Sequence, residues 1–352
     1  MKLVALTADN HIHPHGDSLF RLQTCLDCFE WICQESIKKG VKNIIHAGDL
    51  FHDRHKINVY AYNQLYNLIK KYNNDLNFYF LLGNHDIYYK ESKIISSLNP
   101  LQEITNVKII NDPSTLNING YNIDFIPYSE DIVNLLNSFE KKSDVLISHL
   151  SIVGAKTNYI YDIEYFDSFN NKDIQRSNDI LNSYKKVFLG HFHIKQFIEP
   201  NIQYLGSPLH LSYGDAMTDR GFFILNTENL NVDFIENKIS PRYYILPYNE
   251  DFSKYDLNNS YLKILIPQSC KSNWIEIKDS ITNNYNVLSI DIEPIQDNIS
   301  SETELIINSV DDFKNDKENL IKDYVNTFDN LNLNKEKLIK IGMEIVLKTN
   351  EN

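Results

Sequence analysis

The stretch "FLLGNHDIYY", residues 80–89, decides the interpretation of this sequence. An apolar run ends at Gly83, and Asn84, His85 and Asp86 follow it in succession. A turn needs glycine or asparagine for its backbone, but it does not need a histidine and an aspartate as well. Polar groups at the carboxyl end of a buried strand are typical of a ligand site in an open α/β sheet. We therefore expect an α/β fold with a site at this strand end.

The first half of the chain alternates strands with helices. Apolar runs predict strands at 2–9, 41–49 and 76–83, and helical periodicity predicts helices at 18–39, near 59–72 and near 92–104. This βαβ pattern predicts a largely parallel, buried sheet.

The pattern changes after residue 106. Short strands follow, with Asn119-Gly120 as a hairpin turn signal, and a helix near 130–140 precedes strands at 144–149 and 185–193. Further short strands continue to about residue 236. The sequence therefore predicts two sheets packed face to face, with helices outside.

The last third predicts two smaller parts. Residues 237–247 have the character of a linker, and a small α+β domain follows, with a helix near 272–284. From residue 311 the chain is highly charged, with apolar residues at helical spacing, which predicts two helices. The expected fold is thus α/β (α+β): a two-sheet sandwich over 1–240, a capping domain over 241–310 and a helical tail over 311–352.

Composition limits the function. The chain has 352 residues, a hydrophobic content of 42% and a formal net charge of −13. This charge argues against general electrostatic affinity for nucleic acid, so such a function would need a local basic patch, bound cations or a partner subunit. No apolar run is long enough to cross a bilayer, and the N-terminus lacks the features of a signal peptide. We expect a soluble cytoplasmic protein without a membrane partner, in the host cytoplasm if a phage encodes it.

The four cysteines fit a reducing compartment. Cys25 and Cys28 form a CxxC pair, but no second pair follows at the spacing of a zinc site. Since Cys25, Cys28 and Cys33 lie in a segment of helical periodicity, we interpret them as buried helix residues rather than metal ligands.

Five predicted strands share one kind of ending. Taken alone, a single aspartate or histidine after a strand is usually a turn or surface residue. Together, the carboxyl ends of parallel strands lie at one edge, so these residues should converge there. A cluster of Asp, Asn and His without Cys suits manganese, iron or zinc, and a bridging carboxylate can hold two such ions. The residues are Asp9, His11, Asp49, His52, Asn84, His85, Asp86, His149, His191 and His193.

The motif order resembles that of the calcineurin-like metallophosphoesterases. The chain carries "DNH" (9–11), "GDLFH" (48–52), "GNHD" (83–86), "SH" (148–149) and "GHFH" (190–193). A narrower resemblance, to the nuclease subunit of the SbcCD-type double-strand-break repair complex (SbcD type), rests on "GDLFHDRHKIN" (48–58) and "YLGSPLHLSYGD" (204–215).

The resemblance implies a role for each motif residue. The first of two divalent ions, expected to be Mn²⁺, would be held by Asp9, His11, Asp49 and His193. The second would be held by Asp49, Asn84, His149 and His191, with Asp49 as the bridge. His85 would stabilise the transition state or protonate the leaving oxygen, Asp86 would orient His85, and His52 would position the phosphate.

The resemblance also implies partners and a substrate. It suggests a DNA exonuclease and endonuclease of double-strand-break repair and recombination, with an SMC-like ATPase (SbcC type) docked on the C-terminal helices. Homodimerisation would use the helices near 59–72 and 92–104, including Tyr62 and Leu65. Arg54, His55 and Lys56 would contact the DNA backbone, and Ser207 would help to shape the DNA channel. Two alternatives stay open: a phosphatase or small-molecule phosphodiesterase of the same superfamily, and a metal-free binding member of the fold.

Overall fold

The computed structural model describes residues 2–89, 92–152, 154–156 and 179–295. The chain divides into two compact units: Met1–Tyr244 with Leu257–Tyr261, and Ile245–Asp256 with Leu262–Asn352. The predicted tail at 311–352 lies outside the described residues.

The first unit contains a six-stranded sheet in the order β14-β13-β1-β2-β3-β6. Strands β1, β2, β3 and β6 are parallel, and β13 pairs with β1 in the antiparallel direction. The carboxyl ends of the three predicted strands therefore meet at one edge, as expected. The strands are β1 (Leu3–Thr7), β2 (Asn43–His46), β3 (Asn77–Leu81), β6 (Val107–Ile110), β13 (Gly221–Asn226) and β14 (Val232–Glu236).

A second six-stranded sheet has the order β11-β12-β10-β9-β8-β7. Strands β8, β9, β10 and β12 are parallel. The hairpin between β7 and β8 turns at Asn119 and Gly120, which have φ values of 57° and 81°, so the Asn-Gly signal was correct. The strands are β7 (Ser114–Ile118), β8 (Tyr121–Ile126), β9 (Val145–His149), β10 (Lys186–Gly190), β11 (Gln196–Glu199) and β12 (Ile202–Tyr204).

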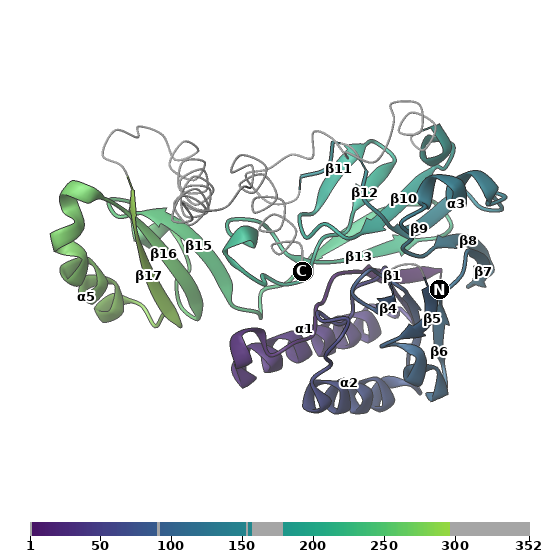
Figure 1. The fold of residues 1–352 in the computed structure, drawn as a ribbon, viewed down its shortest axis with the longest axis horizontal. Coiled ribbons are helices and arrows are strands. Elements are labelled where there is room, and N and C mark those ends of the chain that lie inside the picture. The colour runs from purple at the N-terminus through teal and green to yellow at the C-terminus, as the bar shows by residue number, and fades with distance from the viewer. Residues whose placement is uncertain (1, 90–91, 153, 157–178, 296–352) are drawn as a thin grey trace, which may run out of the picture. The chain divides into compact units, whose positions relative to one another are not determined.

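Helices α1 (Leu19–Lys38) and α2 (Val59–Tyr72) lie beside the first sheet, and α3 (Ile132–Ser138) lies near the second (Figure 1). Each of the two long helices begins at a side-chain cap. Ser18 Oγ accepts a hydrogen bond from the Arg21 N–H at 3.3 Å, and Asn58 Oδ1 accepts one from the Ala61 N–H at 3.0 Å. Short 3₁₀ turns are η1 (His15–Asp17), η2 (Asn99–Glu103) and η3 (Tyr213–Asp215).

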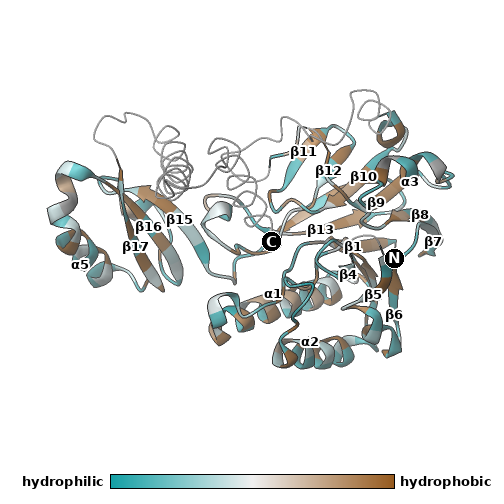
Figure 2. Cartoon of the chain, in the orientation of Figure 1, coloured by the Kyte–Doolittle hydropathy of each residue, from teal (hydrophilic) through white to brown (hydrophobic). Residues whose placement is uncertain are grey.

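The core consists of layers because strand side chains alternate between the two faces of a sheet. Val4 and Leu6 of β1 share a buried cluster with Phe125 of β8 and Ile147 of β9, so this cluster lies between the two sheets. Ala5 instead joins the cluster that α1 and α2 form with the outer face of the first sheet. The strands at the centre of both sheets are accordingly brown in Figure 2, whereas α1 and α2 are mixed in colour.

The helix predicted near 92–104 is wrong. Ser92–Ser96 forms strand β5, which pairs with β4 (Ile87–Tyr89), and only the short turn η2 follows. The β-branched residues Ile94 and Ile95 favour a strand, and Pro100 prevents a regular helix through this segment.

The predicted dimer seam also needs a correction. Leu65 of α2 is fully buried in the core and cannot face a partner, and Tyr62 is partly buried against that core. The apolar residues of α2 that are exposed are Val59, at 83%, and Tyr60, at 53%.

The linker predicted at 237–247 is largely a strand. Residues Arg242–Pro247 form β15, which belongs to a three-stranded sheet with β16 (Ser260–Pro267) and β17 (Ser289–Ile295). The run "RYYIL" has the aromatic and β-branched character of a strand. Helix α5 (Trp274–Asn284), preceded by the turn η5 (Gln268–Asn273), agrees with the helix predicted near 272–284, and a further turn is η4 (Phe252–Lys254).

Two smaller expectations are confirmed. Cys25, Cys28 and Cys33 are buried free thiols on α1, and Cys270 is partly exposed. Among the described residues, no helix is both long and apolar enough to span a bilayer.

Candidate metal centre

Polar side chains gather where five strands end: β1, β2 and β3 of the first sheet and β9 and β10 of the second. The turns that carry them are joined by backbone hydrogen bonds: the Asp9 N–H donates to the Gly48 carbonyl at 3.0 Å, and the His11 N–H donates to the Asp49 carbonyl at 3.1 Å. The residues are Asp9 and His11 after β1, Asp49 after β2, Asn84 after β3, His149 at the end of β9, and His191 and His193 after β10.

These residues form two groups of metal-ligand atoms. In one group the ligand atoms of Asp9, His11 and His193 all lie within 4.8 Å of one another. In the other, the same holds for Asp49, His149 and His191. Each group contains three of the four residues that the family resemblance assigns to one ion, and the assignment of the ligands stays a prediction.

Asp49 belongs to the second group and also lies close to His11 of the first group. Its Oδ2 is 3.8 Å from His11 Nε2 and 3.3 Å from His149 Nε2. Asn84 completes the second group, because its Oδ1 lies 3.0 Å from His149 Nε2 and 2.8 Å from His191 Nδ1. A carboxylate in this position can contact two ions at once, as the predicted bridge requires.

The backbone of the centre is unusual. Asp9, His11, Asp49 and His191 have φ values of 53°, 44°, 58° and 101°, in the left-handed region that non-glycine residues seldom adopt. Such conformations cost about 1–3 kcal/mol each and occur mainly at functional sites. Four ligands thus have strained backbones, which the surrounding fold stabilises.

Glycines allow the turns to approach one another. A Cβ atom on Gly83 would lie 2.2 Å from Asp49 Oδ1, and one on Gly48 would lie 2.2 Å from His149 Nδ1. A real Cβ cannot come that close. The glycines of the "GD" and "GNHD" motifs are therefore needed for space beside the ligands.

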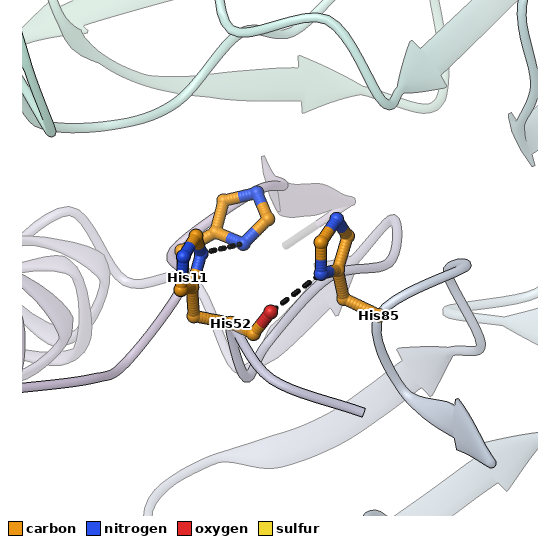
Figure 3. A group of neighbouring side chains, drawn as sticks. All are labelled: His11, His52 and His85. Atoms are coloured by element: carbon orange, nitrogen blue, oxygen red, sulfur yellow. Dashed lines mark hydrogen bonds between the residues drawn. The ribbon is translucent and has the colours of Figure 1, made fainter. Parts of the chain in front are cut away.

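His52 and His85 border the first group (Figure 3). Their rings are parallel, with an interplanar angle of 9° and centroids 5.7 Å apart, and His52 Nδ1 lies 3.3 Å from His11 Nδ1. His85 Nδ1 lies 2.5 Å from the His52 carbonyl oxygen, to which it donates. This contact fixes the tautomer of His85 and leaves its Nε2 available for proton exchange.

Asp86 does not occupy its predicted place beside the ring of His85. Its carboxylate is 1% exposed and accepts hydrogen bonds from the backbone N–H groups of Asp49, Leu50, Phe51 and Gly83, at 2.8 to 3.3 Å. The described hydrogen bonds orient His85 through the His52 carbonyl instead. Asp86 thus joins the loop that follows β2 to the loop that follows β3. A sequence pattern could not show this role, because the hydrogen-bond partners are backbone N–H groups that meet Asp86 only in the folded chain.

Asp215 has no role that was apparent from the sequence. Its Oδ1 lies 3.7 Å from His193 Nδ1 and 3.1 Å from Arg220 Nη2, and its Oδ2 accepts a hydrogen bond from the Leu211 N–H at 2.8 Å. A carboxylate behind a ligand histidine orients the ring and raises its basicity. The motif "SYGD" (212–215) is the sequence feature that could have indicated a role for Asp215.

His149 is oriented in a similar way. Its Nδ1 donates to the Ala47 carbonyl at 2.8 Å, so its Nε2 faces Asp49. Burial alone would lower the pKa of His149, but Asp49 opposes this effect and raises the pKa to about 9. Burial raises the pKa of Asp9 to about 6 and lowers the pKa of His191 to about 3.

The residues predicted to bind DNA lie in different environments. Arg54 is partly exposed, and His55 and Lys56 are exposed, so all three can reach a ligand from solvent. Ser207 is 2% exposed, and its hydroxyl donates to the Leu209 carbonyl at 2.8 Å. The Ser207 hydroxyl is therefore not exposed to solvent and stabilises the turn that follows β12, whereas a role of Ser207 in shaping the DNA channel stays a prediction.

The donor set fits a pair of divalent cations. His11 Nε2 and His193 Nε2 lie 3.0 Å apart, and one cation between them would satisfy both nitrogens. The buried carboxylates Asp9 and Asp49 supply the negative charge that such cations need. Histidine, aspartate and asparagine without cysteine suit manganese, iron or zinc.

Comparisons with known proteins agree with this geometry. The calcineurin-like phosphoesterase family matches residues 2–212. "Exonuclease subunit 1" of Enterobacteria phage T4 is 26% identical over 278 residues, which covers 77% of this chain and 78% of that protein. A protein described as phosphoesterase 244L, of Invertebrate iridescent virus 6, is 26% identical over 221 residues and covers 60% and 73%.

Solved structures are similar at low sequence identity. An archaeal phosphodiesterase is 15% identical, with a TM-score of 0.35, over 67% of this chain and 99% of that one. A dimetal phosphatase from Danio rerio is 11% identical, with a TM-score of 0.42, over 68% and 96%. Because the family match spans most of the chain and includes every ligand of the two groups, this protein belongs to the calcineurin-like phosphoesterase family.

Proposed function

We propose that this chain is a metal-dependent DNA nuclease that hydrolyses phosphodiester bonds as an exonuclease and endonuclease. The observation that carries the proposal is the pair of ligand groups joined by Asp49, with His85 beside them. The similarity to the T4 exonuclease subunit supports a nuclease activity, for which DNA is the substrate that we propose. Double-strand-break repair and recombination are the processes in which such an activity would act.

The ligands would hold two divalent cations, expected to be Mn²⁺. Bound as a pair, such cations lower the pKa of a shared water and stabilise charge on the attacking and leaving oxygens. Asp9, Asp49 and Asn84 supply oxygen ligands, and His11, His149, His191 and His193 supply nitrogens.

His85 would act as the general acid that protonates the leaving sugar oxygen. A sugar alkoxide is a poor leaving group, so a proton donor near it matters in a diester. His85 Nδ1–H is held by the His52 carbonyl, and Nε2 is the atom that would pass a proton to the leaving oxygen. His52 would position the phosphate, and Arg54 and Lys56 would contact neighbouring phosphates.

Two other functions remain as alternatives. A phosphatase or small-molecule phosphodiesterase would use the same ligands, and the similarity to phosphoesterase 244L is compatible with it. A metal-free binding member of the fold has no use for seven converging ligand residues, four of them strained.

We also propose that this chain binds an SMC-like ATPase and a second copy of itself. The T4 relative is described as a subunit, which supports a complex with an SMC-like ATPase docked on the residues after 311. Such a partner could also supply the DNA-binding surface that a chain of net charge −13 lacks. Homodimerisation could use Val59 and Tyr60 of α2, which are exposed apolar side chains.

The test is hydrolysis of linear double-stranded DNA with Mn²⁺, with a phosphomonoester in parallel. Wild type should degrade DNA, and both a chelator and His85→Ala should reduce the rate at least 100-fold, because general acid–base catalysis contributes about 10²–10⁴-fold. Asn74→Ala, an exposed position before the amino end of β3, is the control that should leave the rate unchanged. Turnover of the monoester with intact DNA would overturn the nuclease proposal.

A further inference from the structure

A tyrosine follows β8 at the edge of the second sheet where metal ligands gather. Strands β8, β9 and β10 lie side by side and run parallel, so their carboxyl ends share one edge (Figure 1). His149 ends β9, and His191 follows β10. Strand β8 ends at Ile126, and Tyr128 comes two residues later. The topology therefore places Tyr128 beside the second ligand group, although Tyr128 is not one of the ligands.

The ring of Tyr128 lies beside two histidines of this group. Its centroid is 6.3 Å from that of His149, with an interplanar angle of 74°, and 6.3 Å from that of His191, with an angle of 30°. The Tyr128 N–H donates to the Leu82 carbonyl at 3.0 Å, which joins this residue to the segment that carries Asn84. The ring also packs against the buried cluster formed by α1, α2 and the first sheet. The backbone and the ring of Tyr128 are thus held next to the ligands.

The hydroxyl of Tyr128 is the part of the side chain that the fold does not use. Among the described residues none forms a hydrogen bond with it, and the side chain is only partly buried, so a ligand can reach it. Tyr204 of the same sheet is different: its buried hydroxyl donates to the Leu150 carbonyl at 2.7 Å and accepts from the Ile152 N–H at 3.0 Å. The hydroxyl of Tyr128 therefore remains free to donate to a ligand at the centre.

The charges near this hydroxyl suit an anion that cations hold. Burial raises the pKa of the Tyr128 phenol, Glu130 and Asp49 raise it further, and Arg54 lowers it. Arg54 and the ligand Asp49 therefore both lie close enough to act on the hydroxyl. Glu130 is exposed, so solvent screens its negative charge. With divalent ions bound to Asp49, an anion beside Tyr128 would lie between those ions and Arg54.

We propose that Tyr128 binds the substrate phosphate: its hydroxyl donates a hydrogen bond to a non-bridging oxygen of the phosphodiester, on the side of the second ligand group. A phenol is a neutral donor, and a hydrogen bond to a charged phosphate oxygen is stronger than one to a neutral acceptor. His85 borders the first group, so the two side chains would contact the phosphodiester from different sides of the centre. This inference rests on the proposed hydrolysis of phosphodiesters and adds a substrate contact to it.

The first experiment measures the affinity of the Mn²⁺-loaded full-length protein for inorganic phosphate by titration calorimetry. Tyr128→Phe keeps the ring and removes only the hydroxyl. It should weaken phosphate binding at least about tenfold, as expected for a lost hydrogen bond to a charged group, with the Mn²⁺ content and thermal midpoint of wild type. Tyr121→Phe, a partly buried position at the other end of β8, should bind phosphate as wild type does. Equal phosphate affinity in Tyr128→Phe and wild type would overturn the proposal, and so would a loss of Mn²⁺ from Tyr128→Phe, which would mean that the hydroxyl supports only the ions.

A second measurement does not depend on how the variants fold. Crystals of the wild-type protein soaked with Mn²⁺ and tungstate, a heavy-atom analogue of phosphate, should show a tungstate oxygen within about 3 Å of the Tyr128 hydroxyl. Tungstate bound at the centre without this contact would refute the proposal.

Hydrolysis of linear DNA separates this inference from the proposed function. Tyr128→Phe should lower kcat/KM at least about tenfold, in proportion to the loss of phosphate affinity. If wild type binds phosphate through Tyr128 but leaves DNA intact, the nuclease proposal fails and the phosphate contact stands. If wild type degrades DNA and Tyr128→Phe matches it in both kcat/KM and phosphate affinity, the contact fails and the nuclease proposal stands.

Discussion

The carboxylate of Asp86 accepts a hydrogen bond of 2.8 Å from the backbone N–H of Asp49. This contact joins the loop that follows β3 to the loop that follows β2, at the residue that lies between the two ligand groups. The same carboxylate also accepts from Leu50, Phe51 and Gly83. Asp86 therefore helps to fix the backbone position of Asp49, the residue predicted to bridge the two ions.

Asp86→Ala should weaken metal binding and destabilise the fold. The substitution leaves the backbone N–H groups of Asp49, Leu50, Phe51 and Gly83 buried without an acceptor, and each such loss costs about 1–3 kcal/mol. We expect a lower thermal midpoint and at least a tenfold weaker affinity for Mn²⁺, measured by calorimetry. Asp86→Asn, which keeps one oxygen acceptor, should have a smaller effect, and Asp233→Ala on the exposed edge should have none. Unchanged metal affinity in Asp86→Ala would contradict this role.

Gly83→Ala should disrupt the centre through a steric effect. The added methyl group would lie 2.2 Å from Asp49 Oδ1 and 2.4 Å from the Asp49 backbone nitrogen, so the bridging carboxylate must move. We expect a loss of Mn²⁺ affinity of at least tenfold, with a correspondingly reduced hydrolytic rate. The matched control is Gly214→Ala, whose methyl group would meet only Ser212 Oγ, at 3.3 Å. Similar metal affinity in the two variants would show that the turn relaxes without moving Asp49.

Removal of divalent cations should lower thermal stability. The buried carboxylates Asp9 and Asp49 and the left-handed backbones of the centre are unfavourable unless cations compensate them. An ion present at 1,000 times its dissociation constant stabilises the folded state by about 4 kcal/mol. Dialysis against a chelator should therefore lower the midpoint in scanning calorimetry, and Mn²⁺ should restore it. Asp49→Asn should lose most of this response; an equal response in that variant would place the stabilising ion elsewhere.

The three thiols of α1 should be unreactive in the native protein. Burial raises the pKa of Cys25 to about 11 and raises that of Cys28 and Cys33 as well, and the thiolate is the reactive form. Ellman's reagent should modify Cys270 quickly and the other cysteines only after addition of denaturant. Cys270→Ser should remove the fast phase. Rapid modification of more than one thiol in the native wild type would show that α1 opens locally.

The convergence of the polar strand ends could be predicted because it depends only on the direction of the strands. Parallel strands bring residues such as Asp9 and His149 to one edge whatever the details of packing. The partners of Asp86 and Asp215 could not be predicted, because they are backbone amides and side chains that become neighbours only in the folded structure. The burial of Ser207 could not be predicted for the same reason, because it depends on how the turn after β12 packs.

The wrong helix near 92–104 has a local cause. Its apolar residues also fit helical spacing, but Ile94 and Ile95 lie in a hairpin with β4, and Pro100 interrupts any helix. Spacing alone cannot separate these two structures in a short segment. The burial of Leu65 shows a similar limit, because periodicity does not indicate which face of α2 packs on the sheet.

Stability should decrease as the pH falls from about 6.5 to about 4, in part because of His210. Burial, followed by the positive charge of Arg220, lowers the pKa of His210 to about 4 from its ordinary value of 6.5, although Asp215 opposes this shift. His210 is 7% exposed and held neutral: its Nε2–H donates to the Thr218 carbonyl at 2.7 Å, and its Nδ1 accepts from the Tyr243 N–H at 2.8 Å.

The sign follows from proton linkage. Between these two pH values the unfolded chain binds a proton at this histidine and the folded chain does not, so the free energy of unfolding rises with pH. Above about pH 6.5 His210 is neutral in both states and the free energy of unfolding is not reduced by its titration. The lowered pKa of His210 corresponds to a loss of about 3 kcal/mol in the free energy of unfolding by pH 4. Denaturant unfolding at several pH values should give a shallower dependence for His210→Gln than for wild type. Asn74→Ala, an exposed substitution that removes no titratable group, should follow the wild-type curve. Parallel curves for His210→Gln and wild type would mean that His210 titrates alike in the folded and unfolded states.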